Sequence, residues 1–81
     1  MDTKALVVGQ EVYMESGVYS CRGKVIEVTS DGVTVDVFIP RHLTLARREL
    51  LRFDSEGKGK NAKGDDNNAT IEGGPWYIVG T

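Results

Sequence analysis

Basic side chains gather in one stretch of this chain, between residues 41 and 63. The stretch holds seven lysine and arginine residues against three acidic ones, a balance of +4, whereas the rest of the chain has a balance of −6. Such side chains bind phosphates through charge and counterion release, without reading a base sequence. The alternative is an ordinary solvated surface. The residues that we expect to hold a nucleic acid or another polyanion are Arg47, Arg48, Arg52, Lys58, Lys60 and Lys63.

Aromatic residues offer a second kind of chemistry, an apolar wall for a protein partner. Tyr19 stands in a predicted loop and Trp76 in the last predicted strand. A protein partner would lie in a groove beside both, or would pair with an open edge strand. The alternative is that Trp76, with Phe38 and Phe53, packs in the core or at its rim, because so short a chain has few large residues for a core.

No set of residues for catalysis or metal binding is visible. Cys21 is the only cysteine and His42 the only histidine, so the chain lacks the several ligands of a zinc site, and a thiol nucleophile has no evident oriented base. Residues 57–60 depart from the phosphate-binding loop of nucleotide-binding proteins, and residues 65–68 lack the spacing of a calcium-binding loop. We therefore expect no enzyme activity, no cofactor and no metal.

Length and composition indicate one small globular domain, residues 1–81, with 40% hydrophobic and 27% charged residues. No apolar run approaches the length of a signal peptide core or a membrane span, so we expect a cytoplasmic protein without a membrane partner. The net charge of −2 and the pI near 5.3 favour a protein partner, whereas the local charge asymmetry favours a polyanion. Both kinds of partner stay open.

The elements that position these residues centre on a predicted β-hairpin. Residues 33–38 alternate between valine and other side chains, and residues 24–29 are rich in β-branched residues, so both stretches predict strands. Residues 30–32 join them, and their Asp-Gly pair is a strong hairpin signal. Val25 breaks the alternation, which predicts either a β-bulge or a strand covered on both faces. Gly23 predicts a bend or a close backbone approach.

An earlier strand is predicted over residues 10–15, with Val12 and Met14 inward. Residues 1–8 form a short lead whose apolar residues 6–8 pack on the barrel edge or add a short strand, and residues 18–22 are predicted to be a loop.

The spacing of several residues in this half resembles the KOW motif and, more broadly, an SH3-like or Tudor-like small barrel. The residues concerned are Gly9 and Val12, then Ser16-Gly17, then residues 22–28, although Ser20-Cys21 replaces the middle glycine of the motif. The resemblance implies an SH3-like barrel, and in a Tudor-type barrel Tyr19 would form one wall of a cage for a methylated cation. Such barrels host many unrelated roles.

Residues 41–53 allow two interpretations. Leucine, alanine and phenylalanine side chains recur at three- and four-residue spacing, which suits an amphipathic helix. Alternatively, residues 43–45 are extended, residues 46–49 form a turn and residues 50–53 form a strand. We prefer the strand, because a small barrel needs a fourth strand here. Residues 54–57 then predict a turn from which residues 58–60 return.

The remainder predicts a mobile, polar loop over residues 57–70, a turn at residues 73–75 and a last strand over residues 76–79. In that strand the first and third residues share one face. The sequence therefore predicts an all-β fold: a small SH3-like, partly open barrel of about five strands, with a long polar loop before the last strand. We expect it to be a non-catalytic binding module.

Overall fold

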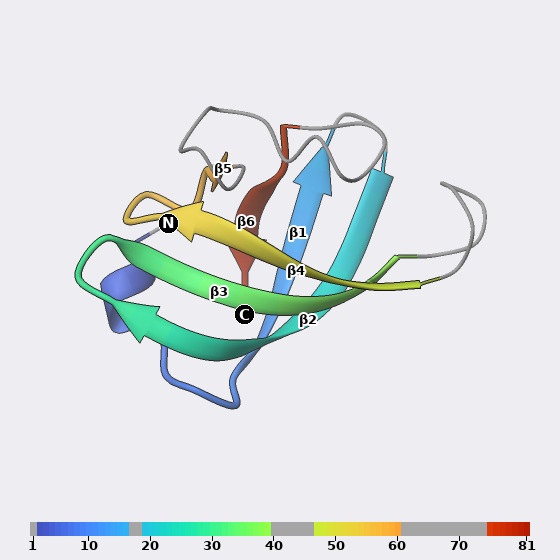
Figure 1. The fold of residues 1–81 in the computed structure, drawn as a ribbon. Helices are drawn as coiled ribbons and strands as arrows, with labels where there is room; N and C mark the ends of the chain where they lie inside the picture. The colour runs from blue at the N-terminus through green and yellow to red at the C-terminus, as the bar shows by residue number, and fades with distance from the viewer. Residues whose placement is uncertain (1, 17–18, 40–46, 61–74) are drawn as a thin grey trace.

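The antiparallel sheet of this protein curls into a small, partly open barrel, so the predicted all-β class is confirmed (Figure 1). The structure is a computed structural model that describes residues 2–16, 19–39, 47–60 and 75–81. The strand order is β5-β4-β3-β2-β1-β6. In chain order the elements are a 3-10 helix η1 (Thr3–Ala5), then β1 (Glu11–Ser16), β2 (Tyr19–Thr29), β3 (Gly32–Ile39), β4 (Arg47–Asp54), β5 (Gly59–Lys60) and β6 (Tyr77–Gly80).

The core follows the period-two patterns of the sequence. In β1 every second residue is buried, with Val12 and Met14 fully enclosed as predicted. The same alternation in β6 buries Ile78 and leaves Tyr77 and Val79 exposed. The buried hydrophobic residues are Leu6, Val12, Met14, Cys21, Val25, Val33, Val35, Val37, Leu51, Phe53, Trp76 and Ile78.

The predicted hairpin joins β2 to β3, and Thr29 pairs with Gly32 across its turn. Gly32 has a φ of +151°, and a Cβ built there would collide with the carbonyl oxygen of Phe53 in β4. The ladder shifts register between Val25 and Glu27, so the bulge, one of the two alternatives, is present. A Cβ at Gly23 would lie 2.9 Å from the carbonyl oxygen of Asp36, so the predicted close approach is confirmed.

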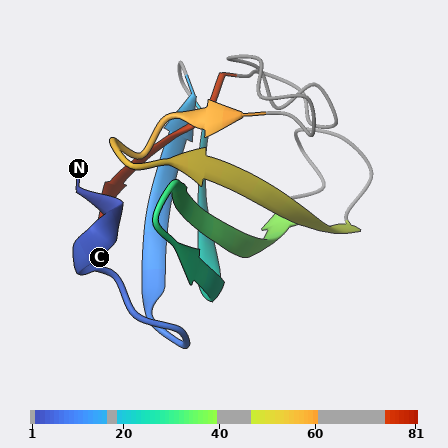
Figure 2. The same cartoon turned by 60° about the vertical axis from the view of Figure 1, so that its left-hand side comes forward.

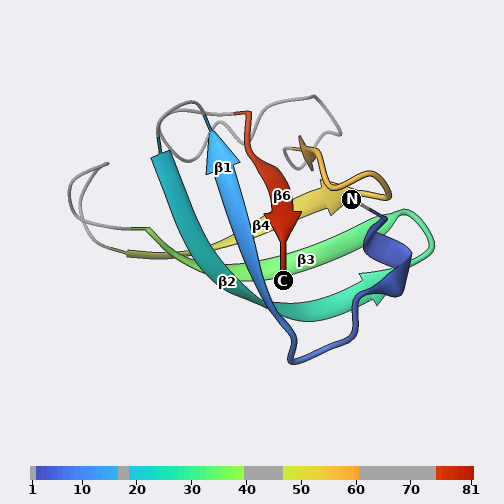
Figure 3. The ribbon, with the colours of Figure 1, turned by 180° about the vertical axis from the view of Figure 1, so that it is seen from behind.

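The barrel closes where β6 meets the turn between β4 and β5. β6 pairs with β1 (Figure 3), and its first residues also contact the turn between β4 and β5. The amide of Gly59 donates to the Trp76 carbonyl at 2.6 Å, and the amide of Ile78 donates to the Gly57 carbonyl at 2.8 Å. Gly57 has a φ of +87°, which lets the chain turn sharply enough for both contacts.

Helix η1 lies at the same end of the barrel (Figure 2). Thr3 is fully buried; its amide donates to the Ser55 carbonyl and its hydroxyl to the Asp54 carbonyl, both at 2.9 Å. Leu6 follows into the core, whereas Val7 and Val8 stay exposed. The lead predicted over residues 1–8 therefore packs on the barrel through Thr3 and Leu6 rather than through an added strand.

The predicted loop over residues 18–22 is wrong for residues 19–22. Tyr19 pairs with Ser16 and Arg22 with Tyr13, so β2 begins directly after the β1–β2 connection. The local sequence lacks a strong strand pattern there, and the ladder with β1 supplies the hydrogen bonds that decide the conformation.

The strand interpretation of residues 41–53 is confirmed where the structure describes them, and the helix interpretation is wrong there. β4 begins at Arg47, so the turn predicted at residues 46–49 is wrong for residues 47–49, which pair with β3. The predicted turn at residues 54–57 is confirmed by the bond from the Gly57 amide to the Asp54 carbonyl. Residues 57–60 lie in this turn and in β5, so the predicted polar loop over residues 57–70 is wrong for residues 57–60; residues 61–70 lie outside the described residues.

Candidate binding surface

A shallow depression of about 590 Å³ lies on the outer face of the sheet, across β1, β2, β3 and β4. The side chains that matter for binding are Glu11, Tyr13, Arg22, Lys24, Asp36 and Arg48. They come together because the register sets Glu11 and Tyr13 opposite Lys24 and Arg22, and Lys24 opposite Asp36. Residues separated by two positions in a strand share a face, so this outward row follows from the buried row beneath it.

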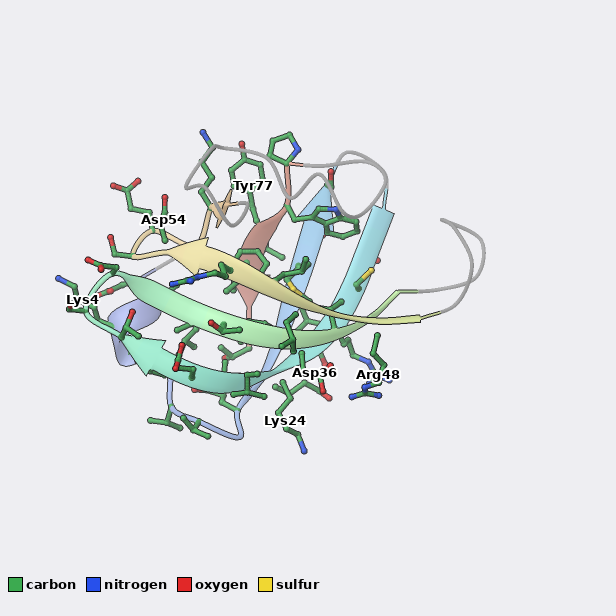
Figure 4. All side chains as sticks on the ribbon, in the orientation of Figure 1. Lys4, Lys24, Asp36, Arg48, Asp54 and Tyr77 are labelled. Atoms are coloured by element: carbon green, nitrogen blue, oxygen red, sulfur yellow. The ribbon has the colours of Figure 1, made fainter. Side chains whose placement is uncertain are left out.

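An ion pair crosses the depression between β3 and β4. Nη2 of Arg48 lies 2.9 Å from Oδ2 of Asp36, and this hydrogen bond with its charge attraction raises the pKa of Arg48. The arginine side chain is 66% exposed, so water screens the pair and the attraction contributes little to folding. Figure 4 shows Lys24, Asp36 and Arg48 on the same side of the sheet.

Arg22 and Lys24 supply positive charge without forming an ion pair within the described residues. Lys24 has Glu11 and Asp36 as cross-strand neighbours, whereas Arg22 stands opposite Tyr13. Tyr13 is 42% exposed, and its hydroxyl donates a long hydrogen bond of 3.4 Å to Oε1 of Glu11. The depression thus presents an exposed aromatic ring beside an arginine, both on rigid strands.

The predicted basic set is divided by the fold. Arg48 lines the depression, whereas Arg52 stands opposite Lys60 in the ladder between β4 and β5, and Lys58 forms a bridge with Tyr77. The side chains of Arg47 and Lys60, and the whole of Lys63, lie outside the described part.

The predicted aromatic groove is not formed by Trp76, which is fully buried in the core. Its indole Nε1 is enclosed and has no hydrogen-bond partner among the described residues, so this side chain serves packing. The prediction of Trp76 as a binding residue is wrong, and the alternative of a core position is confirmed. Tyr19 begins β2 rather than standing in a loop, and its side chain lies outside the described part.

Sequence reasoning missed Tyr13, Arg22 and Lys24 as members of a surface. A signal existed for Tyr13, because it alternates with Val12 and Met14, which were predicted to point inward. Arg22 had no such signal, since its place depends on the ladder between β1 and β2.

Cys21 lies at the floor of the depression, only 6% exposed. Burial raises the pKa of its thiol, which lowers the fraction of reactive thiolate at neutral pH. Within the part of the chain that the structure describes, no three His, Cys, Asp or Glu side chains could hold a metal ion, and no helix has the length and apolar character to span a membrane.

Comparison with known proteins adds nothing to this geometry: no family model, no curated protein and no solved structure matches the chain. The interpretation of the surface therefore depends on its side chains and their arrangement. Those side chains can attract anions and pack against an aromatic or aliphatic group.

Proposed function

We propose that this chain is a non-catalytic binding module that holds a protein partner on the outer face of its sheet. The observation that carries the proposal is the open depression in which exposed Tyr13 stands opposite Arg22. Tyrosine and arginine are the residues most enriched at the energetic centres of protein interfaces. Small-molecule sites, in contrast, enclose most of their ligand. A shallow, open surface favours a polypeptide segment.

The last strand extends this surface. Tyr77 and Val79 are 43% and 52% exposed on β6, which lies beside β1. An apolar segment that leaves the depression across β1 would contact these side chains. The proposed interface thus keeps the last strand, as the sequence predicts, with Tyr77 in the place expected of Trp76.

The KOW- and Tudor-like resemblance remains part of this proposal. A small barrel of consecutive antiparallel strands, in which the last strand lies beside the first, supports it. A small barrel alone does not name a partner.

Binding of a nucleic acid or another polyanion is the second candidate. The observation that favours it is that Arg48 and Arg52 both lie on β4 and are both exposed. Phosphates spaced along a backbone could contact these cations without base recognition.

Charge reversal at the depression tests the first candidate. Proteins would be captured from cell extract with three variants. Two alter the depression, Arg22→Glu and Tyr13→Thr, and the control Lys4→Glu alters an exposed lysine on η1. We expect specific partners to be lost with both depression variants and kept with the control. Equal melting temperatures would show that all three variants fold. Identical capture by every variant would contradict the proposal.

A nuclear magnetic resonance titration with a mixed pool of short RNA and DNA, at low and moderate salt, tests the second candidate. Salt-sensitive shifts at Arg48, Arg52, Lys58 and Lys60 would support polyanion binding. No shift at low salt would remove that candidate.

A further inference from the structure

Among the residues that the structure describes, one edge of β4 lacks a neighbour over most of its length. On one side β4 pairs with β3 from Arg47 to Asp54. On the other side β5 pairs only with Arg52 and Phe53. Within the described residues, Arg47 to Leu51 therefore form an open edge, and such an edge is a template for another extended chain.

The direction of the peptide groups on this edge follows from one hydrogen bond. The amide of Asp54 donates to the Lys58 carbonyl at 2.9 Å, so the peptide groups of Asp54 point away from β3. Peptide groups alternate in direction along an antiparallel strand. Those of Arg52, Leu50 and Arg48 therefore point the same way, and no backbone bond from Leu50 or Arg48 on this side occurs within the described residues.

The side chains beside this edge have a distinct pattern. Arg48, Leu50 and Arg52 all lie on the outer face, and Leu50 is 61% exposed although it is a large apolar residue. An added strand would place its own alternate side chains next to this basic, apolar, basic row.

We propose that the edge of β4 that is open within the described residues binds an extended acidic segment of a partner protein by strand addition. Backbone hydrogen bonds to Arg48 and Leu50 supply the pairing, acidic side chains lie beside Arg48 and Arg52, and an apolar side chain covers Leu50. This inference rests on the proposed function in that the partner is a protein. It shares Arg48 with the depression but depends on the backbone edge of β4, so the two can fail separately.

A second copy of this chain is a poorer occupant. An antiparallel pairing that brings the two exposed Leu50 side chains together also sets each Arg48 opposite an Arg52, and like charges directly opposite destabilise a ladder. A nucleic acid is also a poorer occupant, because it would contact the arginines but has no strand-forming peptide backbone for the groups of Leu50.

A synthetic probe of about seven residues, the length of an ordinary strand, tests the inference directly. Its sequence is Thr-Glu-Thr-Val-Thr-Glu-Thr with capped ends, so that Glu, Val and Glu match the row on β4. Methylating the amide nitrogens of Glu and Val removes the donors that face β4, whereas methylating those of Thr leaves them intact. We expect the first modification to weaken binding about tenfold or more and the second to change it little.

Hydrogen exchange of the protein amides locates the bound probe. In the full chain we expect the probe to slow exchange at Arg48 and Leu50, and to leave Glu49 and Leu51, which face β3, unchanged. The variant Leu50→Pro removes one edge-facing donor at a position where proline is tolerated, and it should abolish binding while the melting temperature shows whether it folds. A probe with lysine in place of glutamate should bind more weakly.

Equal binding of both methylated probes would overturn the inference, since charge alone would then explain the affinity. Concentration-dependent dimers that protect the Leu50 amide would overturn the inference in favour of a second copy of the chain. Protection of this amide by DNA oligonucleotides but not by the probe would overturn it in favour of a nucleic acid. If the Arg22→Glu variant loses partners while the probe fails to bind, the proposed function stands and this inference fails. If the probe binds β4 and Arg22→Glu captures the same proteins as the control, the proposal of binding at the depression fails and the proposal of strand addition to β4 holds.

Discussion

The two halves of β4 belong to one continuous strand but have different surroundings. Residues 52–54 have β3 on one side and β5 on the other, and the Asp54 carboxylate accepts from the amides of Glu56 and Lys58 at 2.9 Å. Residues 47–51 have β3 alone within the described part of the chain. The half that precedes the turn therefore finds its hydrogen-bond partners in that turn and in β5, which are close in the chain.

We propose that this difference separates a folding role from a binding role within one strand. The covered half closes the barrel, because the turn after it meets β6 and receives Thr3 of η1. The free half, residues 47–51, leaves the edge-facing peptide groups of Arg48 and Leu50 without a strand neighbour within the described residues. Changes near the covered half should therefore alter stability, and changes on the outer face of the free half should alter only binding.

The largest effect is expected from Gly32→Ala, which acts on the covered half. A Cβ there would collide with the Phe53 carbonyl oxygen, and the φ of +151° is unfavourable for alanine. We expect a loss of about 4 kcal/mol or more of unfolding free energy, from backbone strain and from displacement of β4. Gly80→Ala is the control, since no atom lies within 4 Å of a Cβ there. Similar urea midpoints for the two variants would contradict this expectation, because they would mean that β3 and β4 leave room for a Cβ at position 32.

Two neighbouring leucines sharpen the comparison between the faces of β4. Leu51 is 2% exposed and Leu50 is 61% exposed. We expect Leu51→Ala to cost about 3 kcal/mol, from lost burial and a cavity, and Leu50→Ala to cost about 0.5 kcal/mol or less. Chemical denaturation measures both. A large loss for Leu50→Ala would mean that its side chain is covered in solution.

A smaller effect is expected where η1 joins the covered half. Thr3→Val keeps the shape of a fully buried side chain but removes the hydroxyl that donates to the Asp54 carbonyl at 2.9 Å. We expect a loss of about 1.5 kcal/mol, since the carbonyl loses a partner in a buried place. Thr34→Val, which removes a long, exposed bond of 3.5 Å to Glu27, is the control and should change stability less.

The smallest effect concerns Cys21, at the floor of the depression. Burial raises the pKa of the thiol, so the folded chain holds this proton at alkaline pH where the unfolded chain begins to lose it. Its contribution to stability is present at neutral pH and is lost as pH rises through the raised pKa. We expect the thiol to react with a disulfide reagent more slowly in the folded protein than in urea. Equal reaction rates in the folded protein and in urea would mean that the structure around Cys21 opens readily to the reagent.

Most of the fold could be predicted because its signals are local. The valines of β3, the Asp-Gly turn and the alternation in β1 and β6 each depend on neighbouring residues, and the structure confirms them. The strand ends were less predictable. Tyr19 and Arg47 begin their strands earlier than expected, because pairing with β1 and β3 supplies hydrogen bonds that no local pattern records.

The candidate surface was less predictable than the fold. The charge pattern predicts Arg48, which lines the depression, whereas the sequence predicts a groove beside Trp76, which is buried. An aromatic side chain is suited equally to a core and to an interface, and only packing decides between them. Arg22 enters the proposal because it lies opposite Tyr13, a relation that depends on strand register.

The sequence by itself determined the fold class and the inward face of its clearest strands, since a period of two forces alternate side chains to opposite faces. It also determined that positive charge gathers before and within the β4–β5 region. Tertiary structure alone decided that the barrel closes at the Gly57 turn, that Trp76 is enclosed and that half of β4 has an open edge within the described residues. These features depend on contacts between residues far apart in the chain, whose hydrogen bonds form only once the sheet has curled.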